Sequence, residues 1–454
     1  MEKKNFVQDA MQEVESLLKN AFAAAMQQGK LPENELPAFT VEIPAETTHG
    51  DFASNAAMVS ARTFRMAPVK IANILAECID CASARYIDRV EIAGPGFINF
   101  FVSDAWFASI VSGVLEAGEE YGRSDIGKGE KVMVEFVSAN PTGPMHMGNA
   151  RGGAIGDCLA AALDACGYDV TREFYINDAG NQIEKFGLSL EARYLQIYKG
   201  EEAVPFPEDG YHGEDIKERA QQYADEHGDC LLNLSEAERR QALVDFALPK
   251  NIEKLRTDLE KYRITYDVWF PESTLHQSGA VKAVVDELTS RGMTYEKDGA
   301  IWYKATEFGG EKDEVLVRAN GNPTYFTADI AYHKNKFVDR HFDRVINVWG
   351  ADHHGHVARL KGAMDAIGLD GSKLDIVLMQ LVRLMKDGEP YRMSKRTGKS
   401  ITLSDLTDLV PIDAARFFFN MREPNSTLDF DLDLAVEESS QNPVYYVQYA
   451  HARI

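Results

Sequence analysis

The residues best suited to chemistry lie in three short segments of this 454-residue chain. His146-Met147-Gly148-Asn149 follows one apolar run, residues 350–356 follow a second, and a basic loop spans residues 383–399. Histidine and asparagine can donate hydrogen bonds to phosphate oxygens, and glycine lets a base or ribose lie against the backbone. A lysine brought onto a triphosphate stabilises developing negative charge. Together the segments predict a site for nucleotide chemistry.

The first segment is predicted to begin a helix. Residues 131–137 alternate as in a largely buried strand, residues 140–144 break regular structure, and apolar residues recur at helical spacing up to Cys166. A second apolar run, residues 170–175, completes a β–α–β unit. The helix N-terminus has free N–H groups and the positive end of the dipole, which favour phosphate. A capping loop in an ordinary α/β protein is an equally good explanation of these four residues alone.

The second segment, GADHHGH, follows an apolar strand at residues 345–349. Gly350 permits close approach of a nucleotide, and Asp352 can accept hydrogen bonds from its hydroxyl groups. Three histidines suggest zinc, but neither a cysteine nor a carboxylate completes a set at the usual spacing. Cys78 and Cys81 form a lone CxxC pair, which suits buried helix positions better. We therefore expect no protein-held metal and no structural zinc.

The third segment, RLMKDGEPYRMSKRTGKS, is strongly basic. A solvated charged loop is the ordinary explanation. Its place after the last apolar strand favours a role in phosphoryl chemistry, with Gly398 giving mobility. Its cations are Arg383, Lys386, Arg392, Lys395, Arg396 and Lys399.

Composition restricts the class of protein. Hydrophobic content of 45% and charged content of 26% are typical of a globular enzyme. No apolar run is as long as a membrane span, and the charged start MEKKNFVQDA is unlike a signal peptide. We expect a cytoplasmic protein without a membrane partner. The net charge of −23 argues against non-specific nucleic-acid binding, although a local basic surface is compatible with it.

The order and spacing of the segments resemble the HIGH and KMSKS motifs of class I aminoacyl-tRNA synthetases, here HMGN and RMSKR, roughly 250 residues apart. The surrounding sequence is similar to that of arginyl-tRNA synthetases over essentially the whole chain. DFASN and GPGFINF resemble that family's N-terminal tRNA-contacting domain. The other matching stretches are EFVSANPTGPMHMGN, NDAGNQI, TYFTADIAYH, WGADHHGH, RMSKRTGKSITL and DAARFFF.

The resemblance implies ligation of arginine to its tRNA through an arginyl-adenylate, with ATP as substrate, Mg²⁺ as a cofactor, and a monomeric enzyme. It places the substrate arginine at Glu135, Asn140, Tyr325 and Asp329. Carboxylates suit a guanidinium, and Tyr325 and Asp329 share a face if their segment is helical. It assigns catalysis to His146, Asn149 and Lys395, and ATP binding to His146, Gly148, Asn149, Gly350, Asp352, His356, Met393, Ser394 and Lys395.

Two departures from the motifs matter. Asn149 stands where the family has a second histidine, so it can donate to phosphate but cannot carry charge. Arg392 and Arg396 stand where the second motif has lysine and serine, which keeps positive charge but changes its geometry. A synthetase for another amino acid, a small nucleotidyltransferase and a non-catalytic tRNA-binding relative remain as alternatives. The carboxylates favour a cationic substrate, and His146, Gly148 and Lys395 favour catalysis.

We expect an α/β protein with a Rossmann-type parallel-sheet catalytic domain. The predicted parts are an N-terminal α+β tRNA-contacting domain (1–115), a linker (116–130), the first half of the catalytic domain (131–182), a largely helical insertion (183–320), the second half with the basic loop (321–410), and a helical segment (411–454). Asn442 and Pro443 predict a final helix. In the resembled family this position begins an anticodon-binding domain, so we expect a truncated form that charges tRNA poorly.

Overall fold

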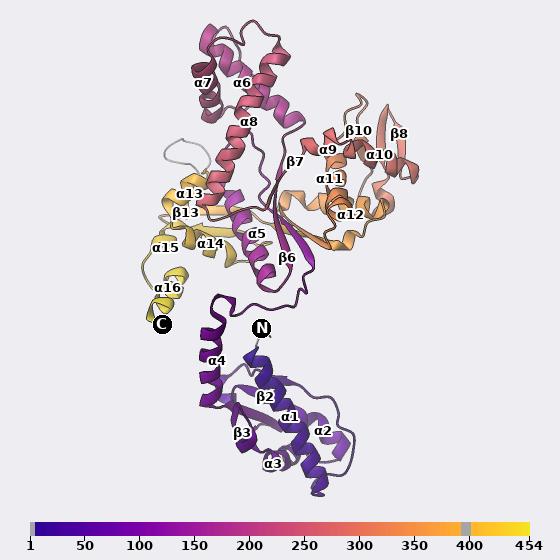
Figure 1. The fold of residues 1–454 in the computed structure, drawn as a ribbon, viewed down its shortest axis with the longest axis vertical. Coiled ribbons are helices and arrows are strands. Elements are labelled where there is room, and N and C mark those ends of the chain that lie inside the picture. The colour runs from indigo at the N-terminus through magenta and orange to yellow at the C-terminus, as the bar shows by residue number, and fades with distance from the viewer. Residues whose placement is uncertain (1–4, 392–400) are drawn as a thin grey trace. The chain divides into compact units, whose positions relative to one another are not determined.

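The computed structural model describes residues 5–391 and 401–454, and the chain forms two compact units, Met1–Ser124 and Asp125–Ile454. Figure 1 shows the elements of both. The N-terminal unit packs helices against an antiparallel sheet of order β1-β2-β4-β3. Its elements are α1 (Phe6–Gln27), β1 (Val41–Glu42), β2 (Phe52–Ser54), α2 (Ala56–Phe64), α3 (Pro68–Cys78), β3 (Ile87–Ala93), β4 (Phe97–Val102) and α4 (Asp104–Ala117).

Local sequence explains these elements. Val14, Leu18 and Phe22 recur at helical spacing in α1 and are fully buried. Pro68 occupies the first turn of α3, where its missing N–H has no intrahelical acceptor to lose. Helix α4 continues to Ala117, so the expected linker at 116–130 begins as helix. These residues therefore form a small α+β unit of their own.

The second unit is built on a five-stranded parallel sheet of order β12-β11-β5-β6-β7. The predicted α/β class with a parallel sheet is confirmed. Both faces of the sheet are covered: Val132 and Val134 of β5 belong to one hydrophobic core, and Met133 between them belongs to another. The strands are β5 (Lys131–Glu135), β6 (Asp169–Ile176), β7 (Val268–Pro271), β11 (Arg344–Gly350) and β12 (Leu374–Met379).

Residues 183–320 differ from the expected helical insertion. Helices α6 (Asn181–Lys199), α7 (Glu214–His227) and α8 (Glu236–Lys261) share a core and gather at one end of the unit in Figure 1. Beyond Lys261 the chain instead adds β7 to the main sheet and forms an antiparallel sheet of order β10-β9-β8. Four-residue strands carry too little periodicity to be recognised. The elements are α9 (Ser273–Gln277), α10 (Ala280–Ser290), β8 (Thr294–Lys297), β9 (Ala300–Tyr303) and β10 (Glu314–Val317).

The remaining elements complete the unit. Helices α5 (Met147–Ala165), α11 (Tyr325–Lys334) and α12 (His354–Ala366) flank the sheet strands. The segment 411–454 consists of three helices, the strand β15 (Leu428–Asp431) and the turns that join them, and β15 pairs in parallel with β13 (Val382–Lys386). Asn442 caps α16 (Pro443–Arg453) by accepting a hydrogen bond from Val444 N–H, as predicted. The others are β14 (Glu389–Pro390), α13 (Leu403–Leu409), α14 (Ile412–Asn420) and α15 (Leu432–Val436).

Candidate functional site

The strand order reverses between β5 and β11, which is where open parallel sheets have their binding crevice. From β5 the chain crosses through α5 to β6 on one side, whereas β11 lies on the other side of β5. Ligands in open parallel sheets bind at such a reversal of order, outside the carboxyl ends of the strands. Residues 146–149 follow β5 and residues 350–356 follow β11. The fold therefore brings two of the three predicted segments to one edge.

Residues 146–149 form the N-terminal cap of α5. The Gly148 N–H donates to His146 Nδ1 at 3.1 Å, and the His146 N–H donates to Asn149 Oδ1 at 3.0 Å. Desolvation lowers the pKa of His146, which favours its neutral ring. The Asn149 oxygen is thus engaged in the cap, while its amide NH₂ can still donate to a phosphate. An asparagine at this position can do both tasks.

The chain that follows the basic loop is attached to the same cap. The Met147 N–H donates to the Ile401 carbonyl at 3.1 Å, and the Leu403 N–H donates to the Met145 carbonyl at 2.9 Å. Residues 392–400 lie outside the described residues, and with them the predicted Met393, Ser394 and Lys395 and the departures Arg392 and Arg396. The described structure therefore connects the residues just after the third segment to the first segment.

The second segment presents one exposed acid and one buried histidine. The Asp352 side chain is 82% exposed, whereas His356 lies buried in the first turns of α12. A Cβ on Gly350 would lie 2.4 Å from Asp352 Oδ1, so a side chain at residue 350 would displace the carboxylate. Gly350 thus permits this position of the exposed Asp352 carboxylate.

Residues predicted for two different substrates meet at His356. Its Nε2 lies 2.9 Å from Asp329 Oδ2, and its Nδ1 accepts from Arg359 Nε at 2.7 Å. The same guanidinium donates to the Tyr325 hydroxyl at 3.1 Å and to Glu314 Oε1 at 2.9 Å. Arg359, which the sequence analysis missed, therefore fixes Tyr325 and His356 relative to each other. Its only signal in the sequence was a position on the helix that follows GADHHGH.

Glu135 is not a free carboxylate. Its Oε2 accepts from Lys336 Nζ at 2.5 Å and its Oε1 accepts from Ser138 Oγ at 3.0 Å. Val137 and Ser138 have positive φ angles, which is strained for a β-branched residue and turns Ser138 towards Glu135. Asn140 lies exposed in the loop beyond. The structure thus brings Glu135 to the predicted edge as one half of a buried ion pair.

A buried polar network continues from Lys336. Lys336 Nζ donates to Asn347 Oδ1 at 3.2 Å, and Asn347 Nδ2 donates to His333 Nε2 at 2.9 Å. His333 Nδ1 donates in turn to the Asp329 carbonyl at 2.8 Å. Burial, then the nearby Lys336, holds the pKa of His333 well below its ordinary value, so the ring is neutral. The network connects the two predicted guanidinium ligands, Glu135 and Asp329.

Tyr175 lies among the carboxylates of the site. Burial, then the charges of Glu272, Asp329 and Glu135, raises the pKa of its hydroxyl far above the ordinary value. Burial also raises the pKa of Glu272, which lies 3.2 Å from His276 Nε2. Neither Tyr175 nor Glu272 was predicted from the sequence. Their signal was their position at the carboxyl ends of β6 and β7.

The polar run 177–182, also expected at this edge, has a structural task. Asp178 accepts from the Ser273 N–H at 2.8 Å and from Ser273 Oγ at 2.7 Å. These bonds attach the end of β6 to the first residue of α9. The Asp178 carboxylate therefore supports the loops of the site by fixing α9.

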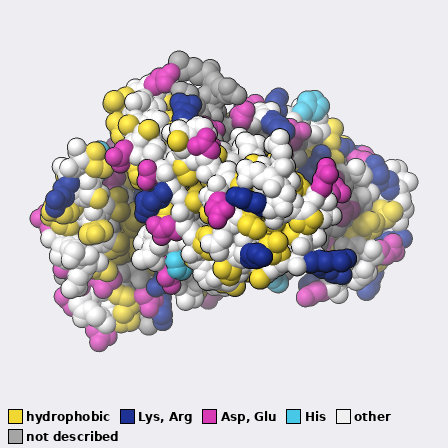
Figure 2. Space-filling model, turned by 90° about the horizontal axis from the view of Figure 1, so that it is seen from below, with side chains coloured by type: hydrophobic (Ala, Val, Ile, Leu, Met, Phe, Trp, Pro, Cys, Tyr) yellow, Lys and Arg dark blue, Asp and Glu magenta, His cyan; other side chains and the backbone are white. Residues whose placement is uncertain are grey.

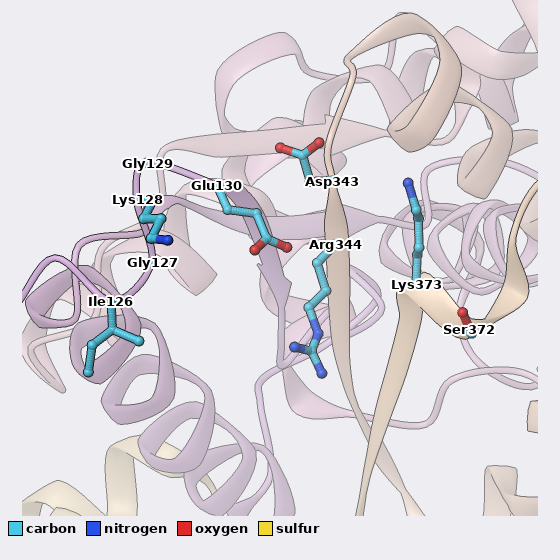
Figure 3. A pocket seen from close by; sticks show the side chains of 9 residues that line it. All are labelled: Ile126, Gly127, Lys128, Gly129, Glu130, Asp343, Arg344, Ser372 and Lys373. Carbon is cyan, nitrogen blue, oxygen red and sulfur yellow. The ribbon is translucent and has the colours of Figure 1, made fainter.

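Two cavities lie near the strands of the second unit. One of about 770 Å³ is lined by Lys128, Arg344 and Lys373, at the amino ends of β5, β11 and β12 (Figure 3). That edge lies opposite the crevice, so the cavity does not belong to the candidate site. A cavity of about 270 Å³ includes Tyr325 and adjoins the candidate site.

The surface, the metal-ligating groups and the helix lengths complete the description of the second unit and its surroundings. Figure 2 shows one face of the molecule, on which basic and acidic side chains are interspersed. Among residues 5–391 and 401–454, the structure contains no group of three or more His, Cys, Asp or Glu residues that could hold a metal ion. In the same residues, every helix is too short or too polar to cross a membrane.

Comparison with known proteins identifies the family. Residues 110–451 match the model of the class I (R) tRNA synthetase catalytic domain, so the second unit is a class I synthetase catalytic domain. Residues 12–102 match the arginyl-tRNA synthetase N-terminal domain. The chain belongs to the arginyl-tRNA synthetase family.

Two curated relatives illustrate the similarity. The arginine–tRNA ligase of Acetivibrio thermocellus is 59% identical over 449 residues, which are 99% of this chain and 79% of the relative. That of Caldanaerobacter subterraneus subsp. tengcongensis is 59% identical over 450 residues, covering 99% and 80%. The structure of Thermus thermophilus arginyl-tRNA synthetase, 20% identical, matches with a TM-score of 0.63 over 97% of this chain and 80% of that one. This last likeness supports the fold.

Proposed function

We propose that this chain attaches arginine to its tRNA in two steps that share the crevice between β5 and β11. The arginine carboxylate attacks the α-phosphate of ATP, giving arginyl-adenylate and pyrophosphate. A hydroxyl of the terminal tRNA ribose then takes the arginyl group and releases AMP. The observation that carries the proposal is that residues 146–149 and 350–356 follow neighbouring parallel strands at the reversal of strand order.

ATP is proposed to bind across this crevice. The cap of α5 offers the Asn149 amide, the His146 ring and the positive end of the helix dipole to its phosphates. Gly148 leaves room there, because a Cβ would lie 3.0 Å from the His146 ring. Gly350, Asp352 and His356 would face the adenosine, with the exposed Asp352 carboxylate as acceptor for ribose hydroxyls. Met393, Ser394 and Lys395 are proposed to complete the site.

Arginine is proposed to bind where Asp329, Glu135 and Tyr325 converge. Asp329 is 29% exposed, so its carboxylate is open to a ligand. The Tyr325 hydroxyl accepts from Arg359, and its own proton remains available for a substrate acceptor. Asn140 lies in the loop after β5, where it can reach the backbone groups of the amino acid. Charge-assisted bonds to a guanidinium explain the preference for a cationic substrate.

Catalysis on this site is positioning and charge neutralisation. A carboxylate must approach a polyphosphate, and the described site offers amide and N–H donors against that repulsion. Lys395 is proposed to supply positive charge as the transition state forms. Mg²⁺, when bound with ATP, supplies further neutralisation. It would bind mainly through substrate phosphates, with one or two carboxylates of the protein.

The proposed partners follow from the same reaction. The N-terminal unit is proposed to contact the tRNA outside its anticodon, and the enzyme is proposed to act as a cytoplasmic monomer. Amino-acid-dependent exchange of pyrophosphate into ATP, in the presence of tRNA, tests the function. Exchange that depends on arginine supports the proposal, and exchange that depends on another amino acid refutes it.

A further inference from the structure

We propose that Lys336 is a positioning residue that cancels the charge of Glu135, so that of the two predicted arginine ligands Asp329 supplies the charge that selects a guanidinium. The inference rests on the proposed function and deepens it, because it divides the task of recognising arginine between two carboxylates. The observation behind it is that one of the two predicted arginine ligands already holds a buried cation.

Both carboxylate oxygens of Glu135 already have hydrogen-bond partners within the protein. Lys336 is fully buried, and its Nζ lies 2.5 Å from Glu135 Oε2. The Ser138 hydroxyl donates a hydrogen bond to Glu135 Oε1. The ammonium also lies 4.0 Å from the centre of the Tyr332 ring. Lys336 belongs to a single π-helical turn, Asn335–Asp339, and such wide turns recur at functional sites. Glu135 is therefore held and neutralised within the protein.

Asp329 has a different environment. Its carboxylate is 29% exposed and meets His356. The network through His333 and Asn347 joins the Asp329 backbone to Lys336, which fixes the distance between the two acidic positions. A substrate cation would thus find its countercharge at Asp329, and Glu135 would contribute shape and hydrogen-bond acceptance.

This arrangement predicts that removing Lys336 has a favourable effect on arginine binding once Glu135 has lost its charge. Glu135→Gln leaves the Lys336 ammonium buried beside the pocket without a countercharge, where it repels a guanidinium. Lys336→Met added to Glu135→Gln removes that repulsion. The second substitution should therefore restore arginine binding that the first has lost. A direct ion pair between Glu135 and the substrate predicts the opposite, because the double variant would still lack the ligand.

The test measures KM for arginine and for ATP in arginine-dependent pyrophosphate exchange with tRNA. Glu135→Gln should raise the arginine KM about tenfold or more, and Glu135→Gln/Lys336→Met should return it to within about threefold of the unmodified enzyme, on the scale expected within one network. The ATP KM should stay within about twofold throughout. Lys334→Met is the control, because Lys334, two residues before Lys336 at the end of α11, forms a partly exposed ion pair with Glu287 of α10, and its loss should leave both values unchanged.

A second measurement tests which carboxylate supplies the negative charge that recognises the guanidinium. Citrulline replaces the guanidinium by a neutral group of the same shape, and it should compete poorly with arginine for the unmodified enzyme. Asp329→Asn should remove most of the preference for arginine over citrulline, whereas the Glu135→Gln/Lys336→Met variant should keep it. An arginine KM in the double variant equal to or above that of Glu135→Gln, or an unchanged preference in Asp329→Asn, overturns the inference. Failure of the unmodified enzyme to respond to arginine refutes the proposed function itself.

Discussion

Substitution of Asn149 separates the two tasks that the structure gives this residue. Its Oδ1 accepts from the His146 N–H at 3.0 Å, and its amide nitrogen is proposed to donate to ATP. Asn149→Asp keeps the acceptor, loses the donor and adds negative charge. Asn149→Ala loses the acceptor and the donor together. The two variants should therefore differ in stability and agree in poor activity.

The magnitudes follow from the cap. Asn149 is the third helical residue of a capping box whose N-cap is His146, and loss of a capping hydrogen bond costs about 1 kcal/mol, so Asn149→Ala should lower the free energy of unfolding by about that amount. An aspartate keeps the bond and interacts favourably with the helix dipole, by about 0.3–1 kcal/mol, so Asn149→Asp should be at least as stable as the natural chain. Loss of one donor to developing charge typically costs about a hundredfold or more in rate, and the added charge opposes phosphate as well.

Urea unfolding and tRNA-dependent pyrophosphate exchange are the two assays. Glu238→Ala is a matched control, because Glu238 caps α8 by accepting from Ser235 N–H at 3.1 Å in the helical region. It should lose a similar free energy of unfolding and keep its exchange rate. Full activity in Asn149→Asp would refute the phosphate contact. Equal destabilisation of the Asp and Ala variants would refute the cap.

Three further predictions concern other parts of the chain. Lys395→Ala should slow adenylate formation about a hundredfold with little change in ATP affinity, and an unchanged single-turnover rate would contradict this. Burial lowers the pKa of His333, so its neutral ring stabilises the fold above about pH 6.5, and this contribution falls by up to about 1.4 kcal/mol per pH unit in acid. His333→Gln should flatten that pH dependence in urea unfolding. Glu191→Gln should destabilise the helices α6–α8 by roughly 3–5 kcal/mol, because it leaves Arg239 buried without its ion pair, and hydrogen exchange of α6 measures the change.

Local patterns predicted the first half of the site well. The alternation of residues 131–135 and the helical spacing after Met147 specify a strand and a helix that lie close in sequence. The β–α unit and the start of its helix could therefore be predicted. The parallel sheet followed from the alternation of such units. Each of these features depends on residues within a few turns of one another.

The partners of Glu135 could not be predicted from local sequence in the same way. Lys336 reads as a solvated lysine in the sequence HKNKF, yet it is fully buried by pairing across 201 residues. The meeting of Asp329 with His356 depends on the packing of α11 against α12. Strand β7 has four residues and pairs with β6 across a long helical region. Long-range pairing of this kind leaves no periodic signal in a single sequence.

The most direct test of the account is exchange of labelled pyrophosphate into ATP by this chain with tRNA, measured with each of the twenty amino acids in turn. The account predicts exchange with arginine and near-background exchange with the others, including lysine, whose compact ammonium does not match the two-pronged geometry of a guanidinium. Exchange that is equal for all amino acids, or greatest with one other than arginine, would contradict it.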